Sequence, residues 1–242
     1  MTPKSVLIFQ HVSVEHPGIF RNFFLDDGIK LHTIELDQGE SIPDLKSFDA
    51  LWVMGGPMDV WEEDKYSWLV EEIKAIRKAI DELKMPFMGI CLGHQLLAYA
   101  YGAKVGPSDK SEVGVMSVRK TKDGKQSSFF LDLPDIMDTL QWHSSEVKTV
   151  PEGFQVLAES DQCAIQSLSY GDKVFSVQYH QEITEKTVSD WSKISEYKIS
   201  LEQSLGENAV EKLRKDVSVN INNFNDAATL LYKNWKSTAF NN

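Results

Sequence analysis

Cys91 stands between a short apolar run and a helical pattern. Residues 86–90 are typical of a buried strand, and apolar residues recur at helical spacing from Leu92 onward. Glycines lie two positions before and two positions after the cysteine, at Gly89 and Gly93. Small neighbours of this kind permit the sharp strand–turn–helix bend of a nucleophile elbow, which holds a reactive atom in a strained, exposed position. The sequence therefore predicts that Cys91 is presented on a turn at the end of a strand.

A cysteine in this position is suited to nucleophilic catalysis. The helix that follows directs its free N–H groups and the positive end of its dipole at the sulfur, which favours the thiolate form. The alternative interpretation is a buried cysteine beside glycines that serve helix packing. The other cysteine, Cys163, lies in an alternating apolar run and is expected to fill the core. Two such cysteines make neither a disulfide framework nor a paired metal motif.

The stretch Gly-Ile-Cys-Leu-Gly-His-Gln, residues 89–95, resembles the nucleophile motif of class I glutamine amidotransferases. The resemblance extends from about Val6 to Thr184, and within the family it is strongest to stand-alone, GMP-synthetase-like amidotransferases. It implies that Cys91 attacks a carboxamide, that Gln95 helps to bind glutamine, and that no cofactor is needed.

The N-terminal half alternates apolar runs with helical patterns. Residues 6–9, 31–36 and 49–54 are typical of strands, and the first run is apolar throughout, as in a parallel sheet covered on both faces. Helical patterns occupy residues 17–25 and a stretch from Asp64, the expected N-cap, to residue 83. The order predicts an α/β fold with a doubly wound, mostly parallel sheet flanked by helices, and the family resemblance implies a flavodoxin-like arrangement. The second helix is expected to expose a charged face that comprises Glu71, Glu72, Lys74, Arg77 and Lys78.

Beyond residue 104 the pattern changes to short alternating segments separated by turns. Strands are expected at residues 113–119, 155–158, 164–168 and 174–179, and these extend the sheet. Helical spacing returns near the C-terminus, with one apolar stripe over residues 191–205 and another over 213–235. We therefore expect a catalytic domain at residues 1–186 and a C-terminal helical extension at residues 187–242 that packs on it. The alternative role of the extension is a surface for a partner or a second copy.

Gly55-Gly56-Pro57 follows the third predicted strand. Loops beyond the carboxyl ends of parallel strands gather at one rim, so this loop should lie near Cys91. Acyl transfer through a tetrahedral intermediate requires fixed N–H donors, commonly the amide after the nucleophile and one from a neighbouring loop. Leu92 and Gly56 fit these two places. The resemblance to the family's glycine-rich oxyanion loop supports this role and adds Gly55 as a substrate contact, although Gly-Gly-Pro alone is only a turn.

His180-Gln181-Glu182 forms a second constellation. In an extended chain, residues two apart point to the same side, so Glu182 can hydrogen-bond the His180 ring and fix its tautomer. His180 would then serve Cys91 as a base. Zinc deaminases share the His-x-Glu spacing, but they also need a Pro-Cys-x-x-Cys that this chain lacks, so no metal is expected. The family usually has proline between the two residues; Gln181 stands there instead, which affects the rigidity of the turn.

The segment Gln-Trp-His-Ser-Ser, residues 141–145, is expected on a loop. It resembles the segment that contacts the glutamine substrate in this family, which implies that His143 and Ser144 bind substrate. From the residues alone, a histidine beside a tryptophan is more often structural.

Composition restricts the partners. With 25 Lys+Arg against 36 Asp+Glu, the net charge is −11, which disfavours nucleic acid and anionic membranes. No apolar run is long enough to span a membrane and no signal peptide precedes the first strand, so a cytoplasmic location is expected.

The expected substrate is glutamine or a γ-glutamyl compound. No ATP-binding or synthetase pattern is present, so the released ammonia requires a separate synthetase subunit; alternatively, the enzyme hydrolyses a γ-glutamyl peptide or amine by the same chemistry. A cysteine hydrolase of the related intracellular-protease branch is a further alternative, which the His180–Glu182 pair disfavours. A non-catalytic interaction protein that retains the fold is the remaining one.

Overall fold

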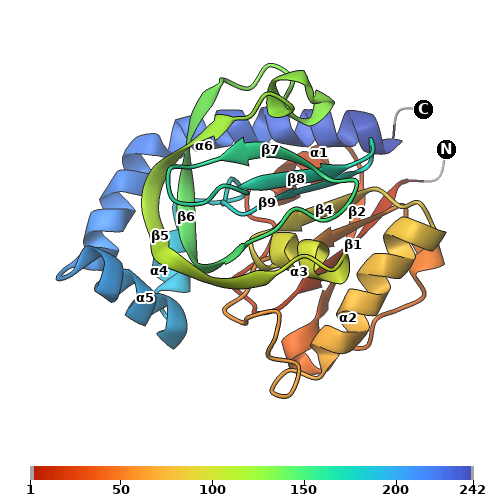
Figure 1. The fold of residues 1–242 in the computed structure, drawn as a ribbon, viewed down its shortest axis with the longest axis horizontal. Helices are drawn as coiled ribbons and strands as arrows, with labels where there is room; N and C mark the ends of the chain where they lie inside the picture. Colours follow the sequence, from red (N-terminus) through yellow and green to blue (C-terminus); the bar gives the residue numbers. More distant parts are fainter. Residues whose placement is uncertain (1–2, 241–242) are drawn as a thin grey trace.

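The computed structural model describes residues 3–240, which form one mixed sheet of nine strands flanked by helices (Figure 1). The strand order is β2-β1-β3-β4-β9-β8-β7-β5-β6. Five neighbouring strands are parallel, namely β2 (Lys30–Glu35), β1 (Ser5–Gln10), β3 (Ala50–Val53), β4 (Phe87–Ile90) and β9 (Val174–Val177). The sheet continues with antiparallel strands, namely β8 (Ser167–Tyr170), β7 (Gln155–Glu159), β5 (Val105–Lys120) and β6 (Ile136–Val147). The predicted α/β class and the β-rich extension of the sheet are confirmed.

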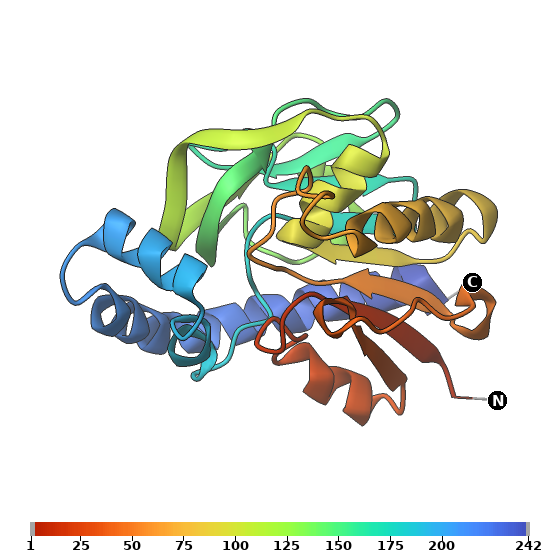
Figure 2. The ribbon, with the colours of Figure 1, turned by 90° about the horizontal axis from the view of Figure 1, so that it is seen from below.

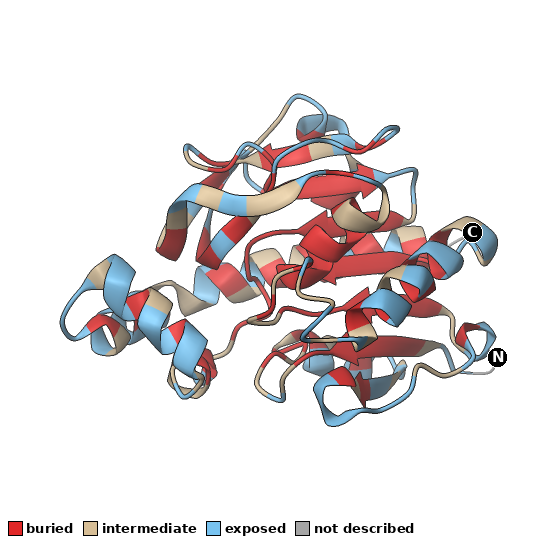
Figure 3. Cartoon of the chain, turned by 60° about the horizontal axis from the view of Figure 1, so that its bottom comes forward, coloured by how far each residue is buried: buried red, intermediate tan, exposed pale blue. Residues whose placement is uncertain are grey.

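The parallel strands are buried because helices cover both faces. Alternate residues of β1 point to opposite sides, so Leu7 and Phe9 belong to one apolar cluster and Val6 and Ile8 to another. The first cluster packs under α2 (Trp68–Arg77) and α3 (Leu92–Ala100), and the second under α1 (Phe20–Asp26) and α6 (Ala209–Phe240). Figure 3 shows the resulting pattern, with a buried sheet and exposed outer faces on α2 and on the C-terminal helices.

The C-terminal extension consists of α4 (Thr187–Trp191), α5 (Ser195–Leu205) and α6. Figure 2 shows α6 running along the length of the sheet, while α4 and α5 lie near one end of β5 and β6. On the sheet side of α6, the Trp235 ring packs edge-on against Trp52, with centroids 5.0 Å apart. None of the helices within residues 3–240 combines the length and apolarity needed to cross a membrane. The division of the chain at residue 186 stays a prediction.

Three predicted boundaries were wrong. The helix begins at Trp68 rather than after Asp64, because residues 59–66 form turns closed by hydrogen bonds from Glu62 N–H to Asp59 O and from Tyr66 N–H to Glu62 O. It continues to the predicted end as a π-helical turn, Lys78–Glu82. The strand expected at 164–168 is β8, Ser167–Tyr170, because residues 161–166 follow a turn in which Ser160 N–H donates to Cys163 O and bend irregularly up to the strand. The stripe over 191–205 is divided between α4 and α5, since Ile194 has an extended backbone with ψ of 127°.

Candidate active site

Cys91 has the expected strand–turn–helix geometry. It connects β4 to α3 with φ of 52° and ψ of −105°, a region that a residue with a side chain rarely adopts. Its N–H donates to Val177 O of the adjacent strand at 2.8 Å, which holds the turn against the end of β9. A Cβ on Gly93 would lie 2.1 Å from Val53 O, and one on Gly89 would lie 2.6 Å from Gly93 O. The two glycines therefore let the helix approach the sheet closely enough to make this turn.

His180 and Glu182 follow β9, the strand beside β4. Ile90 and Val177 are register partners at the ends of these strands, so the two chain segments leave the sheet side by side. His180 Nδ1 donates to Glu182 Oε1 at 2.6 Å, and both side chains are buried. Burial by itself would lower the pKa of His180, but the negative charges of Glu182 and the Cys91 sulfur raise it well above its ordinary value. The arrangement favours an imidazolium beside the sulfur.

The predicted oxyanion loop lies beside Cys91. Gly56 lines the same pocket as the sulfur, and the Leu92 amide is the first of α3, where it has no acceptor within its helix. Gly55 is behind the pocket wall: its carbonyl accepts from His11 Nδ1 at 2.8 Å. The other ring nitrogen, His11 Nε2, lies 2.9 Å from Glu72 Oε1.

The His11–Glu72 pair was not found from the sequence. Glu72 was expected on the solvent face of α2, and this was wrong, because its carboxylate is fully buried against His11. Burial lowers the pKa of His11, but Glu72 outweighs this effect and raises it above its ordinary value, and both ring nitrogens face acceptors, the Gly55 carbonyl and the Glu72 carboxylate. This buried pair fixes the carbonyl of the Gly55 peptide and, with it, the direction of the Gly56 N–H.

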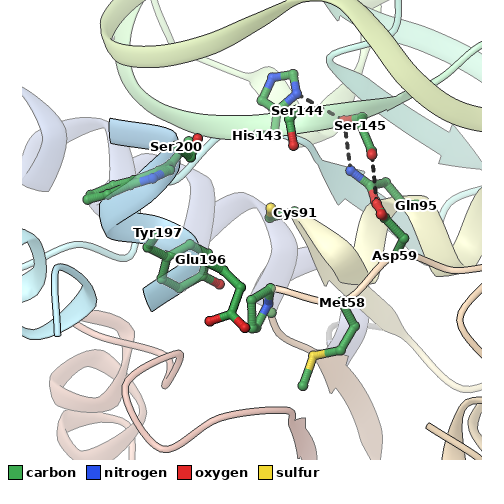
Figure 4. Close-up of a pocket in the computed structure, with 13 residues that line it drawn as sticks. Met58, Asp59, Cys91, Gln95, His143, Ser144, Ser145, Glu196, Tyr197 and Ser200 are labelled. Carbon is green, nitrogen blue, oxygen red and sulfur yellow. Dashed lines mark hydrogen bonds between the residues drawn. The ribbon is translucent and has the colours of Figure 1, made fainter. Parts of the chain in front are cut away.

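Figure 4 shows the pocket around Cys91, which draws on four segments of the chain. It brings together the predicted residues Gly56, Cys91, Gln95, His143 and Ser144. The residues that the sequence did not predict there are Pro57, Met58, Asp59, Trp142, Ser145, Glu196, Tyr197 and Ser200. Asp59 is half-buried and accepts from Ser145 Oγ at 2.7 Å, which places a carboxylate in the pocket wall.

Gln95 positions a second amide beside the nucleophile. Its Nε2 donates to Ser145 O and to Gln178 Oε1, both at 3.0 Å. Gln178 Nε2 in turn donates to Cys91 Sγ at 3.6 Å. Gln178 was missed, although the spacing offered a signal: it stands two residues before His180 and so shares its side of the extended chain.

His143 lies within β6 and not on a loop as expected, because residues 136–147 pair with β5. Its ring is buried, with Nδ1 3.0 Å from Ser145 O and Nε2 3.1 Å from Glu112 Oε2. A carbonyl and a carboxylate are both acceptors, so the two ring nitrogens each face an acceptor. Burial would raise the pKa of Glu112, but hydrogen bonds from His143, Ser160 and Gln166 lower it. The ring of His143 is thus held in the pocket wall by the Glu112 carboxylate on one side and the Ser145 carbonyl on the other.

Glu112→Gln should destabilise the protein, because it removes the buried carboxylate that pairs with His143 and accepts from Ser160 and Gln166. Breaking a buried ion pair in this way costs about 3–5 kcal/mol. Denaturant unfolding measures the change, and Glu71→Gln is the control, since Glu71 pairs with Lys74 on the exposed face of α2 and such pairs contribute about 0–1 kcal/mol. Equal unfolding free energies for the two variants would contradict the ion pair.

Glu15, His180 and Glu182 bring three potential metal-ligating atoms within 4.8 Å of one another, and this is the one such group among residues 3–240. One oxygen of each carboxylate is hydrogen-bonded, since His180 donates to Glu182 Oε1 and Tyr197 donates to Glu15 Oε1, while the two Oε2 atoms have no partner among the described residues. This hydrogen bonding fits a histidine held by carboxylates. The absence of a metal stays a prediction.

Comparisons with known proteins identify the family and the fold of the chain. The model of the glutamine amidotransferase class-I family matches residues 22–190. One subunit of the glutamine-hydrolyzing GMP synthase of Methanocaldococcus jannaschii is 33% identical over 148 residues, which is 60% of this chain and 70% of that protein. Gamma-glutamyl peptidase 3 of Arabidopsis thaliana is 31% identical over 143 residues, 57% of this chain and 56% of that protein.

A solved structure of a glutamine amidotransferase from Thermotoga maritima superposes with a TM-score of 0.87 at 26% identity. The superposition covers 99% of this chain and 100% of the other. The likeness therefore includes α5 and α6, which lie beyond the last residue that the family model matches.

Proposed function

Because this chain belongs to the class I glutamine amidotransferase family, we propose that it hydrolyses a γ-carboxamide with Cys91 as nucleophile, His180 as base and Glu182 as the residue that orients His180. The observation that carries the proposal is the placement of the buried His180–Glu182 pair beside the Cys91 turn, at the ends of two neighbouring strands. The triad requires a nucleophile, a base near it, and a group that fixes the base.

In the first half of the reaction, the proton of Cys91 passes to His180, and the resulting Cys91 thiolate attacks the γ-carbonyl carbon. The carbonyl oxygen becomes an oxyanion, which the N–H groups of Gly56 and Leu92 stabilise. The intermediate collapses as its C–N bond breaks and His180 gives the proton to the departing nitrogen. Ammonia leaves, and a γ-glutamyl thioester remains on Cys91.

In the second half, water attacks the thioester and gives a proton to His180. The second oxyanion forms at the same two amides. The C–S bond then breaks, glutamate leaves, and the proton on His180 returns to the Cys91 thiolate. Glu182 keeps Nδ1 protonated in both halves, so that the other ring nitrogen alone exchanges protons.

The pocket carries charges that suit the amino-acid end of glutamine. Asp59 offers a carboxylate to the α-ammonium group, while the His143 ring lies in the same wall, where its protonated form would attract the α-carboxylate. Gln95 and Ser144 complete this subsite with polar groups. These contacts orient the side-chain amide toward Cys91.

The fate of the ammonia distinguishes two activities. By similarity to the GMP synthase relative, which is one subunit of its enzyme, a separate synthetase subunit would receive it. By similarity to gamma-glutamyl peptidase 3, the enzyme would instead cleave γ-glutamyl compounds and need no acceptor. The test is glutamate release from glutamine, γ-glutamyl peptides and γ-glutamyl amines, with the Cys91→Ser variant as blank. Glutamate release from glutamine only in the presence of a synthetase subunit supports the first activity. Glutamate release from γ-glutamyl compounds by the isolated protein supports the second. No release under any of these conditions contradicts the proposal.

Gln181→Pro should raise glutamine hydrolysis by the isolated protein several-fold. Proline fixes φ and makes the turn between His180 and Glu182 more rigid. The substitution also removes a buried side-chain amide that has no hydrogen-bond partner among the described residues. Steady-state kinetics compare Gln181→Pro with Gln181→Ala, which removes the amide without fixing φ. The rigidity argument fails if the two variants hydrolyse glutamine equally fast.

A further inference from the structure

Glu15 is a third buried carboxyl group at the catalytic centre. It lies between β1 and α1 and is 1% exposed. Its Oε1 accepts a hydrogen bond from the Tyr197 hydroxyl, and its carboxylate comes within 4.8 Å of the ligating atoms of both His180 and Glu182. The reaction steps described above do not use it.

Tyr197 belongs to the C-terminal extension, which reaches the catalytic centre through two helices. From α5, Tyr197 lines the pocket near Cys91 (Figure 4). From α4, the Trp191 ring lies edge-on to the His180 ring with centroids 4.6 Å apart, and its Nε1 donates at 3.0 Å to Val14 O, next to Glu15. The extension therefore contacts both the catalytic base and the segment that carries Glu15.

The burial of Glu15 opposes stability. Its Oε2 has no hydrogen-bond partner among the described residues. Burial is the main cause that raises the pKa of Glu15 from 4.5 to about 7, while the nearby His180 lowers it. The pKa of Glu15 is higher in the folded state than in the unfolded state, so protonation of Glu15 stabilises the folded protein. This stabilisation is fully present below pH 4.5 and is lost as the pH rises through about 7. A carboxylate that costs stability at neutral pH is expected to have a role at the site it occupies.

The charged and titratable groups that face Glu15 come from three segments, namely His11 beside the oxyanion loop, His180 and Glu182 after β9, and Tyr197 of α5. Of these, His180 is the group whose charge changes during the reaction. A carboxylate within 4–6 Å of a histidine stabilises its imidazolium form.

We propose that Glu15 is a positioning residue, held in place by Tyr197, that stabilises the imidazolium form of His180 together with Glu182. The proposal rests on the proposed function, in which His180 accepts the Cys91 proton and then releases it to the leaving nitrogen. Glu182 contacts Nδ1 of the ring, and Glu15 adds a second negative charge while Tyr197 keeps that carboxylate from moving. The C-terminal extension thereby completes the catalytic centre.

Glu15→Gln tests the charge while preserving the shape. NMR titration of the His180 ring, assigned with His180→Ala, should show a midpoint lower by at least about one pH unit, the lower end of the effect of an opposite charge at this distance. In turnover, the alkaline limb of kcat/KM should move to lower pH by the same interval, and at pH values above the limb kcat/KM should be about tenfold lower than in wild type, since one pH unit corresponds to a factor of ten. Thermal unfolding at pH 8 should occur at a higher temperature than in wild type, because a costly carboxylate is gone.

Tyr197→Phe should shift the His180 midpoint in the same direction but less. The Tyr197 hydrogen bond favours the ionised form of Glu15, so its loss leaves less negative charge beside His180. In the double variant, kcat should fall no further than in Glu15→Gln alone, because Tyr197 acts through Glu15. The matched controls are two single variants, Tyr232→Phe and Asp27→Asn. Tyr232 of α6 also donates to a carboxylate, Asp27 Oδ2, at 2.6 Å, but at the C-terminal end of α1. These control variants should leave the His180 midpoint and kcat unchanged.

An unchanged His180 midpoint in Glu15→Gln would overturn the proposal, as would an equal shift in the control variants. A purely structural link predicts lower thermal stability for Glu15→Gln with no movement of the pH limb. The NMR titration needs no substrate, so it decides the role of Glu15 even if no γ-carboxamide is hydrolysed. Failure of the proposed function would appear separately, as absence of glutamate release by the wild type.

Discussion

Cys91→Ser should abolish glutamate release, and a glutamine-like electrophile should label Cys91 of the wild type and no other residue. The loss in kcat should be on the order of 10⁶-fold, as for the nucleophile of other triads. Cys91 alone combines a helix N-terminus with a histidine whose imidazolium form is favoured. Peptide mapping after labelling and steady-state kinetics of the variant measure the two effects.

Cys163→Ser is the matched control. Cys163 is buried, and burial raises the pKa of its thiol, so it is a poor nucleophile at neutral pH. The control should be labelled as strongly as wild type and retain its activity. Label on Cys163, or full activity in Cys91→Ser, would contradict the assignment of the nucleophile.

The turn at Cys91 was predictable because its determinants are consecutive. The strand, both glycines and the helix occupy one short segment, and each restricts the backbone locally. The pairing of His180 with Glu182 was predictable for the same reason, since the two residues are two positions apart. Local spacing also predicted that strands and helices alternate in the first half of the chain, and hence the parallel part of the sheet.

Contacts between distant segments had no such local signal. Glu72 meets His11 across 61 positions, and the helical pattern of α2 placed this glutamate on the solvent face. Tyr197 meets Glu15 across 182 positions, on opposite ends of the chain. In both cases a glutamate, Glu72 or Glu15, is buried against a partner that is distant in the sequence. Composition and periodicity do not predict such long-range contacts.

The loop expected around His143 shows a related difficulty. The polar residues of 141–145 resemble a loop when considered alone, but pairing with β5 makes them part of a long strand. Propensity for strands depends on neighbours more than on the segment itself. In β6 the His143 side chain pairs with Glu112, and the Ser145 hydroxyl donates to Asp59 while its backbone carbonyl accepts from Gln95.

His180→Ala should abolish turnover, whereas Glu182→Gln should leave a residual rate. Loss of the base should reduce kcat by about 10⁶-fold and loss of the orienting carboxylate by about 10⁴-fold. A glutamine at position 182 still has an oxygen that can accept from His180 Nδ1, but its amide can rotate to donate instead and so favour the unproductive tautomer. Glu182→Gln also removes the charge that raises the pKa of His180. Its alkaline limb of kcat/KM should therefore lie at lower pH than that of wild type.

Stopped assays of glutamate release over a range of pH measure both variants. His32→Ala is the control for loss of a histidine, because His32 is exposed on β2 and far from the pocket residues in the fold. Equal rates for wild type, His180→Ala and Glu182→Gln would mean that the pair is structural. If Glu182→Gln keeps a residual rate and the alkaline limb of its kcat/KM profile does not move, the Glu182 carboxylate orients the His180 ring without raising its pKa. Because the pair is buried and its hydrogen bond is 2.6 Å long, we expect the limb to move.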